Sequence, residues 1–535
     1  MNRYKYFYLL FIIIAAAACI ALAGCTKKFD AYNTNPNQAT EADLNNDFVG
    51  LGVFIPQMEE NVVVADPQAG VAPYQTIQNL NADIFSGYNG TPTAFNGGSS
   101  NAQYNINGSW SNKAFDNPYT TIMADWLQVK IRAVSHPDFY ALANIIKVAG
   151  MHRVTDIFGP MPYSQFGAGG FEVGYDSQQA IYNSFFSELD SAIATLTTFV
   201  TNNPGVTPAQ NYDLVYQGNY TEWIKFANSL KLRLAMHIVY ADPALAQQEA
   251  EAAVNNSYGV MTTNADNAFL SSSPTVVVYN PLYTIDVGFG DIRFGAVLQS
   301  LLTGYNDPRI PDYMLTAPGF PNTPYIGVRT GINLSAGNYR QMSGINVTLN
   351  APIQWMTAAE VDFLRAEGAL RGWNMGETAQ YFYQQGIQTS FTQYGVSGAA
   401  YITNSTNTAA PYTDPYNSVN NVPAGSPELS TITIQWDNTA AFETNLERII
   451  TQKYIAMFPN GQEAWTEFRR TGYPKIWPVV ENFSNGAIST QIQIRRLPYP
   501  PNEYSNNDPS VTQAVSTLLG GPDNGGTKLW WDQKP

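Results

Sequence analysis

Amphipathic segments that occur in neighbouring pairs constrain the fold of this chain more than any other feature. Apolar side chains recur at steps of three or four residues in several stretches, which is the spacing of one face of an α-helix. The clearest stripes consist of Ile181, Phe185, Leu189, Ala192 and Leu196, of Trp223, Phe226, Leu230, Leu234 and Ile238, and of Leu446, Ile450, Tyr454 and Met457. We therefore predict a helix at each of these stretches.

The predicted helices are joined into hairpins by short connections. One hairpin joins residues 220–240 to 243–255, and another joins residues 358–372 to 377–394. Paired helices of this length suggest tetratricopeptide-like repeats, although the consensus letters of that repeat are not cleanly present. The predicted fold is mainly α, with tetratricopeptide-like helical hairpins, long irregular loops and minor β structure.

Capping residues mark the ends of two of these helices. Asp176 stands where an N-cap is expected, with Gln179 three residues later. Thr357 and Glu360 form a capping-box pattern at the start of the second hairpin, and Gly372 is expected directly after its first helix.

Long stretches rich in Gly, Asn, Pro and Tyr separate the paired helices. They cover about residues 84–117, 258–290, 315–352 and 397–437. Loops of this length in a compact domain are usually functional or contain short strands of their own. No clear linker divides the chain into independent domains.

The N-terminal segment has the layout of a secretory signal. Arg3 and Lys5 precede an uncharged apolar run from Phe7 to Ala23. A run of this length could barely span a bilayer, so a retained anchor is the alternative interpretation.

The four residues Leu22-Ala23-Gly24-Cys25 resemble the lipobox of bacterial lipoproteins. In that class the cysteine thiol is acylated and the chain is cut before the cysteine. We therefore expect residues 1–24 to be a lipoprotein signal peptide, Cys25 to be lipidated, residues 25–40 to be a polar tether, and residues 41–535 to form a single helical domain. Several acyl chains on one cysteine would attach the protein stably to a membrane.

Cysteine and histidine chemistry is then largely excluded. The chain has two cysteines, of which Cys19 leaves with the signal and Cys25 is consumed by lipid. No thiol remains for catalysis, for a zinc site or for an iron–sulfur cluster. The three histidines His136, His152 and His237 lack metal-ligand spacing and are expected to be structural. We predict no metal and no cofactor.

Pairs of carboxylates leave one catalytic possibility open, which is glycoside hydrolysis. Glu360 and Glu367 lie on one predicted helix face, and Glu463 and Glu467 are four residues apart. Capping and ion pairing explain these residues equally well, so no catalytic residue is predicted. Two aspartates, Asp286 and Asp291, could bind Ca²⁺, but no EF-hand spacing supports such a site.

The composition argues against nucleic acid and anionic lipid headgroups as partners, because the net charge is −15. Charged residues make up 13% of the chain, and aromatic residues also make up 13%. Rings and amides suit neutral polyols, whose apolar faces stack on rings and whose hydroxyl groups pair with amides. The same residues also fill long ordered loops, so composition leaves both interpretations open.

A series of longer motifs resembles one family, the SusD/RagB-type nutrient-binding outer-membrane lipoproteins of Bacteroidetes. The motifs, in order, are FDAYNTNPNQAT (29–40), TDIFGPMPYSQ (155–165), YDSQQAIYNSFFSELDSAI (175–193), DLVYQGNYTEWIKFANSLKLRLAM (213–236), LTGYNDPRIPDY (302–313), MTAAEVDFLRAEGALRGW (356–373), QKYIAMFPNGQEAWTEFRRTGYP (452–474), RRLPYPPNEYSNN (495–507) and WWD (530–532). Each motif is weak alone, but their order along most of the chain is specific.

This resemblance implies a helical core of tetratricopeptide-like units and a position in the outer membrane, lipid-anchored and facing the cell surface. It implies a lid over a TonB-dependent, SusC-like transporter. The lid would capture a glycan, or in some members a peptide, and pass it to the channel without catalysis. The resemblance also implies that Trp465, Arg469 and Arg470 hold helices together.

Ligand-contacting residues vary within this family, so the site is predicted from ring-bearing loops. The candidates are Tyr88, Phe95, Tyr104, Trp110, Tyr283 and Phe289. The alternatives are a surface glycoside hydrolase, a peptide-binding member of the family, and a structural subunit that contacts no ligand. A cleft with two carboxylates would favour the hydrolase, whereas exposed rings without such a pair would favour the binding protein.

Overall fold

The computed structural model of this chain describes residues 3–24, 46–170 and 172–534. Two units are distinguished, Met1–Gly50 and Leu51–Pro535. Helix α1 (Arg3–Gly24) belongs to the first unit. Cys25 and the predicted tether at residues 25–40 lie outside the described residues, so the anchor and the domain boundaries stay predictions. Within the described ranges, no helix combines the length and apolarity that crossing a membrane would require.

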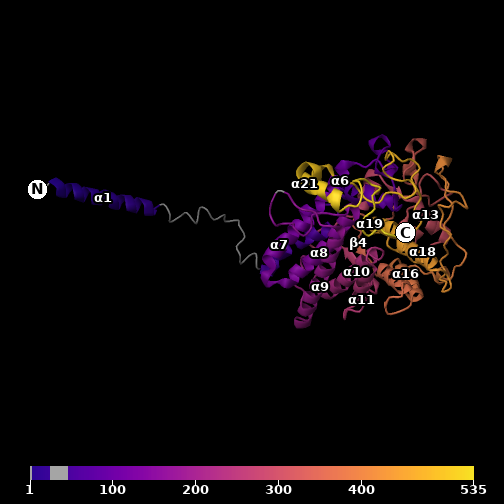
Figure 1. Cartoon of the computed structure of the whole chain (residues 1–535), viewed down its shortest axis with the longest axis horizontal. Coiled ribbons are helices and arrows are strands. Elements are labelled where there is room, and N and C mark those ends of the chain that lie inside the picture. The colour runs from indigo at the N-terminus through magenta and orange to yellow at the C-terminus, as the bar shows by residue number, and fades with distance from the viewer. Residues whose placement is uncertain (1–2, 25–45, 171, 535) are drawn as a thin grey trace. The chain divides into compact units, whose positions relative to one another are not determined.

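Antiparallel helical hairpins build the second unit, and this confirms the mainly α prediction. Helix α8 (Pro137–Phe158) packs against α9 (Gln178–Asn202), and α10 (Tyr220–His237) packs against α11 (Pro243–Val254). Figure 1 shows these four helices side by side, in purple to magenta.

A second group of helices continues this packing. Helix α15 (Ala358–Leu370) packs against α16 (Ala379–Gln393), and α18 (Phe442–Ala456) contacts both of them. Helix α19 (Gly461–Thr471) contacts α10 and so links the two groups. The other helices are α4 (Val49–Gly52), α5 (Ile55–Glu60), α6 (Gly108–Pro118), α7 (Ala124–Arg132), α12 (Pro281–Tyr283), α13 (Ala296–Tyr305), α14 (Ile310–Tyr313), α17 (Ala399–Ile402), α20 (Pro501–Asn506) and α21 (Asp508–Thr517).

The apolar stripes predicted from sequence form the interior of the hairpins. Every member of the three stripes is at most 1% exposed, including Trp223, Leu230 and Tyr454. Burying such large side chains contributes about 1.5–3 kcal/mol for each of them, so packing rather than helix propensity stabilises these elements. Helix α8 is buried over nearly its whole length, including polar residues such as Lys147 and Arg153, so it lacks the division into a buried and an exposed face that is typical of amphipathic helices.

The predicted caps are partly right. Thr357 caps α15 by accepting a hydrogen bond from the Glu360 backbone N–H, and Gly372 follows that helix with a positive φ of 84°. At the start of α9, however, the cap is Ser177, whose Oγ accepts from the Ala180 N–H at 3.2 Å. Asp176 is therefore wrong as a cap, and its carboxylate instead accepts from the backbone N–H groups of Tyr163 and Ser164.

Two short antiparallel pairs of strands lie in the long loops, together with short helical turns. Strand β1 (Asn89–Gly90) pairs with β3 (Arg293–Phe294), and β2 (Ala268–Leu270) pairs with β4 (Ile353–Met356). Strand β1 lies in the predicted loop 84–117 and β3 follows the predicted loop 258–290, so the pair connects these two regions although about 200 residues separate them in the chain.

Candidate functional site

Two of the six predicted ring residues belong to the interior. Tyr88 is 1% exposed, and its hydroxyl donates to the backbone carbonyl of Tyr454. Tyr104 is 4% exposed, and its ring lies 6.5 Å from that of Phe85. Neither ring presents a face to solvent, so the structure corrects both from ligand contacts to packing residues. The large size of tyrosine allows it to fill a loop core, and composition cannot distinguish this role from binding.

Phe95 and Trp110 form a ring pair on the surface. Their ring centroids are 5.7 Å apart with an interplanar angle of 89°, which is the edge-to-face arrangement that aromatic pairs favour. Both rings are half-buried because they pack on the core cluster of Leu80, Ile84 and Ala102. We call Phe95 and Trp110 the ring platform.

Helical structure positions Trp110, although the sequence predicted a loop there. Trp110 lies in the first turn of α6, which is capped by the Asn107 side chain accepting from the Ser109 N–H at 3.0 Å. Helix α6 packs on the π-helix η2 (Gln75–Asp83), so the tryptophan is attached to the core rather than to a free loop.

Three loops meet beside this platform, at Asp291. The Thr93 hydroxyl donates to Asp291 Oδ1 at 2.7 Å, and Gln75 Nε2 donates to Asp291 Oδ2 at 2.9 Å. Arg340, from the third loop, donates to the Thr93 hydroxyl at 2.9 Å and lies 3.5 Å from the same carboxylate. The Arg340 side chain is 48% exposed, so part of its guanidinium faces solvent. Sequence reasoning considered Asp291 for Ca²⁺ and missed this bridging role.

The second predicted loop contributes the remaining two rings. Phe289 is 37% exposed at the end of the π-helix η8 (Thr284–Phe289), and Tyr283 is half-buried in α12. The neighbouring Asp286 pairs with Arg293 at 2.6 Å and accepts from the Ile345 N–H at 2.6 Å. Protein groups therefore already engage the carboxylates of both Asp286 and Asp291.

The glutamates considered for hydrolysis lie in a buried network of charges. Glu360 receives two hydrogen bonds of 2.7 Å from Arg233, and Glu367 receives two of 2.7 Å from Arg470. Lys453 Nζ lies 3.3 Å from Glu467 and 3.5 Å from Glu463. We call these seven residues and His237 the charge network. They connect α10, α15, α18 and α19 through ion pairs and are at most 3% exposed.

His237, Glu463 and Glu467 also have the spacing of a metal site, since their ligand atoms lie within 4.8 Å of one another. The ammonium group of Lys453 already supplies a cation to both glutamates, as the distances above show. Burial raises the pKa of Glu463, but His237, Arg233 and Lys453 outweigh burial and hold that pKa well below its ordinary value.

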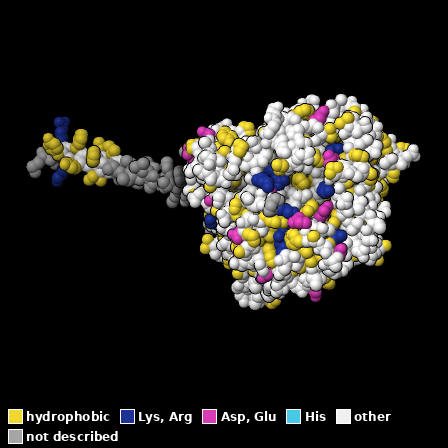
Figure 2. All heavy atoms as spheres, turned by 45° about the vertical axis from the view of Figure 1, so that its right-hand side comes forward, with side chains coloured by type: hydrophobic (Ala, Val, Ile, Leu, Met, Phe, Trp, Pro, Cys, Tyr) yellow, Lys and Arg dark blue, Asp and Glu magenta, His cyan; other side chains and the backbone are white. Residues whose placement is uncertain are grey.

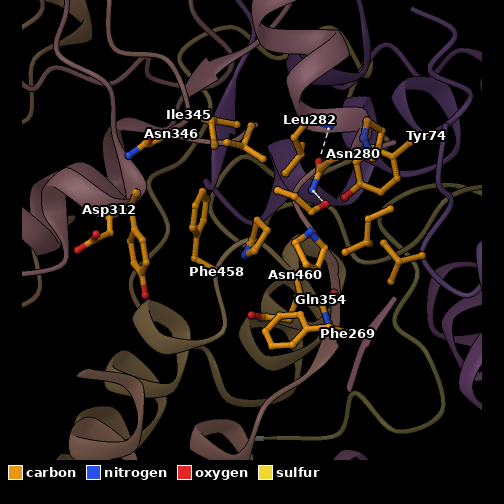
Figure 3. Close-up of a pocket in the computed structure, with 18 of the residues that line it drawn as sticks. Tyr74, Phe269, Asn280, Leu282, Asp312, Ile345, Asn346, Gln354, Phe458 and Asn460 are labelled. Atoms are coloured by element: carbon orange, nitrogen blue, oxygen red, sulfur yellow. Dashed lines mark hydrogen bonds between the residues drawn. The ribbon is translucent and has the colours of Figure 1, made fainter. Parts of the chain in front are cut away.

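A separate pocket of about 370 Å³ is lined in part by Gln78 of η2 (Figure 3). Aromatic rings, including those of Tyr313 and Phe458, and amide side chains, including those of Asn280, Gln354 and Asn460, line it. Tyr74 faces this pocket, whereas the next residue, Gln75, reaches Asp291. None of the six predicted ring residues lines the pocket. The stretch Phe458-Pro459-Asn460, which contributes to the lining, lies within a motif that the sequence had singled out only for family resemblance.

Comparison with protein-family models matches residues 31–532 to the SusD-like family, described as SusD and RagB outer membrane lipoprotein. Among solved structures, a chitin-binding SusD homologue from Flavobacterium johnsoniae shares 46% identity, with a TM-score of 0.86 over 91% of this chain and 99% of that one. A SusD homologue from Bacteroides uniformis shares 38% identity, with a TM-score of 0.83 and the same coverage. The comparison with curated proteins finds no match.

The charge network predicts a pH dependence of stability. Burial alone lowers the pKa of His237, but Glu463 and Asp156 on either side outweigh burial and raise the pKa to about 9. Because the pKa of His237 is higher in the folded state than the unfolded value of about 6.5, protonation of His237 stabilises the fold. This contribution of about 3 kcal/mol is complete below pH 6.5 and is lost as the pH rises to about 9. NMR titration should show imidazolium at His237 at neutral pH.

His152 provides an internal control, because burial lowers its pKa to about 3 and its ring should stay neutral over the same range. A His237 titration midpoint at or below 6.5 would contradict the assignment.

The bridging role of Asp291 predicts a local effect of the isosteric change Asp291→Asn. Removing the charge weakens the bonds from Gln75, Thr93 and Arg340, so amide hydrogen exchange should accelerate in residues 89–97 and 289–294. The matched control is Asp508→Asn, since Asp508 is exposed and its carboxylate accepts only from Thr512 in its own helix. Unchanged exchange in both loops would show that the carboxylate does not hold them together.

Proposed function

We propose that this chain, which belongs to the SusD and RagB family of outer membrane lipoproteins, binds an oligosaccharide or polysaccharide at the cell surface and passes it on without breaking a bond. The ring platform carries this proposal. The two rings are held on the core and are partly exposed, and the apolar face of a sugar stacks on the exposed part of such a ring at low entropic cost.

Hydrogen-bonding groups beside the platform support the same proposal. Thr93, Arg340 and Asp291 form a connected set at the meeting of the three loops, and Arg340 has donors that face solvent. Hydroxyl groups of a sugar need both donors and acceptors, and this set offers both. Figure 2 shows one face of the molecule, on which most surface atoms belong to uncharged side chains or backbone and several charged side chains lie near the middle.

Chitin oligosaccharides are the first ligands to test. The F. johnsoniae homologue that shares 46% identity with this chain is described as chitin-binding. The alternative of a surface hydrolase has less support, because the glutamates proposed for it lie in the charge network rather than in a cleft. A peptide ligand, as in other members of the family, remains an outcome of the same experiment.

The ligand would be delivered to a partner TonB-dependent, SusC-like transporter. Modest affinity suits this role, because the ligand must be released into the channel after capture. Co-purification of a transporter with this chain from detergent-solubilised membranes is the measurement that bears on this partner, and a chain recovered free of any transporter would count against the lid.

Replacing Trp110 tests the binding site. Trp110→Ala should weaken the binding of chitin tetrasaccharide about fivefold to tenfold, because one stacked ring contributes about 1–1.5 kcal/mol. Calorimetric titration of the full chain in detergent measures this change. Trp373→Ala is the control, since Trp373 is a half-buried tryptophan at the end of α15. Equal affinity in the wild-type chain and in Trp110→Ala, or binding of peptides alone, would contradict the proposal.

Lipid attachment is tested at Cys25. A clickable fatty-acid probe should label the wild-type chain in cells and should not label Cys25→Ser, because only the thiol can carry the lipid. The wild-type chain should also sediment with membranes, while the variant should be released from them. Equal labelling of the two chains would place the lipid elsewhere and would remove the basis for a surface anchor.

A further inference from the structure

The pocket beside η2 combines amide groups and apolar walls in an arrangement that the ring platform lacks. Asn280, Gln354 and Asn460 come from three separate segments and converge on its interior (Figure 3). The ring of Phe458 faces the same space. A volume of about 370 Å³ lies within the usual range for small-ligand sites.

Each of the three amides keeps hydrogen-bonding capacity for a ligand. Asn280 donates to the Ala351 carbonyl at 3.3 Å, Gln354 donates to the Met457 carbonyl at 3.1 Å, and Asn460 donates to the Trp355 carbonyl at 3.3 Å. An amide nitrogen carries two hydrogens, so each of the three retains a second donor within the described structure. The side-chain oxygens of Asn280 and Gln354 each accept one bond, from the Leu282 N–H and from Gln393, and so keep one acceptor position, whereas the oxygen of Asn460 already accepts from Arg153 and from the Glu463 N–H. These bonds hold the amides in place, so they are oriented before a ligand arrives.

The remaining lining is mainly apolar and carries little charge. Leu282 and Ile345 are nearly fully buried and form part of the wall, and Tyr313 packs 5.0 Å from Phe458 between ring centroids. Neither lysine nor arginine is present among the described residues that line the pocket, and its one carboxylate, Asp312, lies at the edge of the group in Figure 3. This lining disfavours anionic sugars. It is suited to neutral ligands that have both polar and apolar parts.

We propose that this pocket binds the acetamido group and ring of one N-acetylhexosamine unit. The acetamido N–H and carbonyl complement the side-chain amides, while its methyl group and the sugar ring cover the apolar wall and Phe458. This inference rests on the proposed carbohydrate function and adds a selectivity for N-acetylated sugars over their hydroxylated counterparts. It assigns that selectivity to a site distinct from the ring platform.

Access to the pocket can be blocked from its rim without disturbing the core. Val347 is half-exposed and lines the pocket, so a tryptophan in its place would occupy the space that the sugar needs. Val419 is 70% exposed and does not line the pocket, so Val419→Trp is a matched control for the same change. Gln354→Leu removes one of the three amides while keeping a side chain of similar size.

The experiment compares chitobiose with cellobiose, which carries a hydroxyl group in place of each acetamido group. Ligand-observed NMR titration of the full chain in detergent should show that the wild type and Val419→Trp prefer chitobiose by about fivefold or more, the factor that one or two net hydrogen bonds give. This preference should disappear in Val347→Trp, fall in Gln354→Leu, and persist in Trp110→Ala.

The outcomes separate this inference from the proposed function. Equal binding of the two disaccharides by the wild type, or a preference that survives Val347→Trp, would overturn the pocket assignment while Trp110-dependent binding of chitin tetrasaccharide still stands. A preference that is lost in Trp110→Ala but not in Val347→Trp would move the selectivity to the platform and also overturn the assignment. If the wild type binds none of these sugars, both proposals are overturned.

Discussion

The buried charge network determines how the helical hairpins fit together. Arg233 joins α10 to α15, Arg470 joins α19 to α15, and Lys453 holds α18 against the glutamates of α19. Fully buried ion pairs contribute little net stability compared with apolar packing, but removing one partner leaves an unpaired charge that costs several kcal/mol. The network therefore disfavours any other arrangement of these four helices. The loops that connect to them start and end at fixed positions.

The proposed binding surface combines rigidly held aromatic rings with polar loop residues. Helix α6 carries Trp110, and π-helix η2 supplies Leu80 beneath the ring platform and Gln78 in the pocket lining, while Asp291 joins three loops through hydrogen bonds. Stacking rings need firm support, which the helices provide, whereas sugar hydroxyl groups need accessible donors and acceptors, which the loops provide. The proposed binding surface is thus partly helical, although its residues come from stretches that look like loops.

The sequence predicts the hairpins well because apolar periodicity reports directly on burial. Apolar spacing predicts the buried stripe from Trp223 to Ile238, and glycine's tolerance of positive φ predicts that α15 ends before Gly372. Tertiary packing does not override either local preference. Tyr88 and Trp110 show where such rules stop. The sequence cannot distinguish a tyrosine that fills a loop core from one that faces a ligand, and α6 begins among residues typical of turns. The pocket is lined by segments that range from Val63 to Asn460, so no local sequence pattern predicts it.

The meeting of three loops at a single carboxylate has a consequence for how related proteins can diverge. A change in any one of the loops of Thr93, Asp291 and Arg340 alters the hydrogen bonds of the other two, since Thr93 and Arg340 both engage Asp291, as does Gln75 of η2. New ligand preferences in such a site would arise through coordinated exchange of all three segments. Transplanting a single loop between homologues should therefore disrupt recognition more often than transfer it.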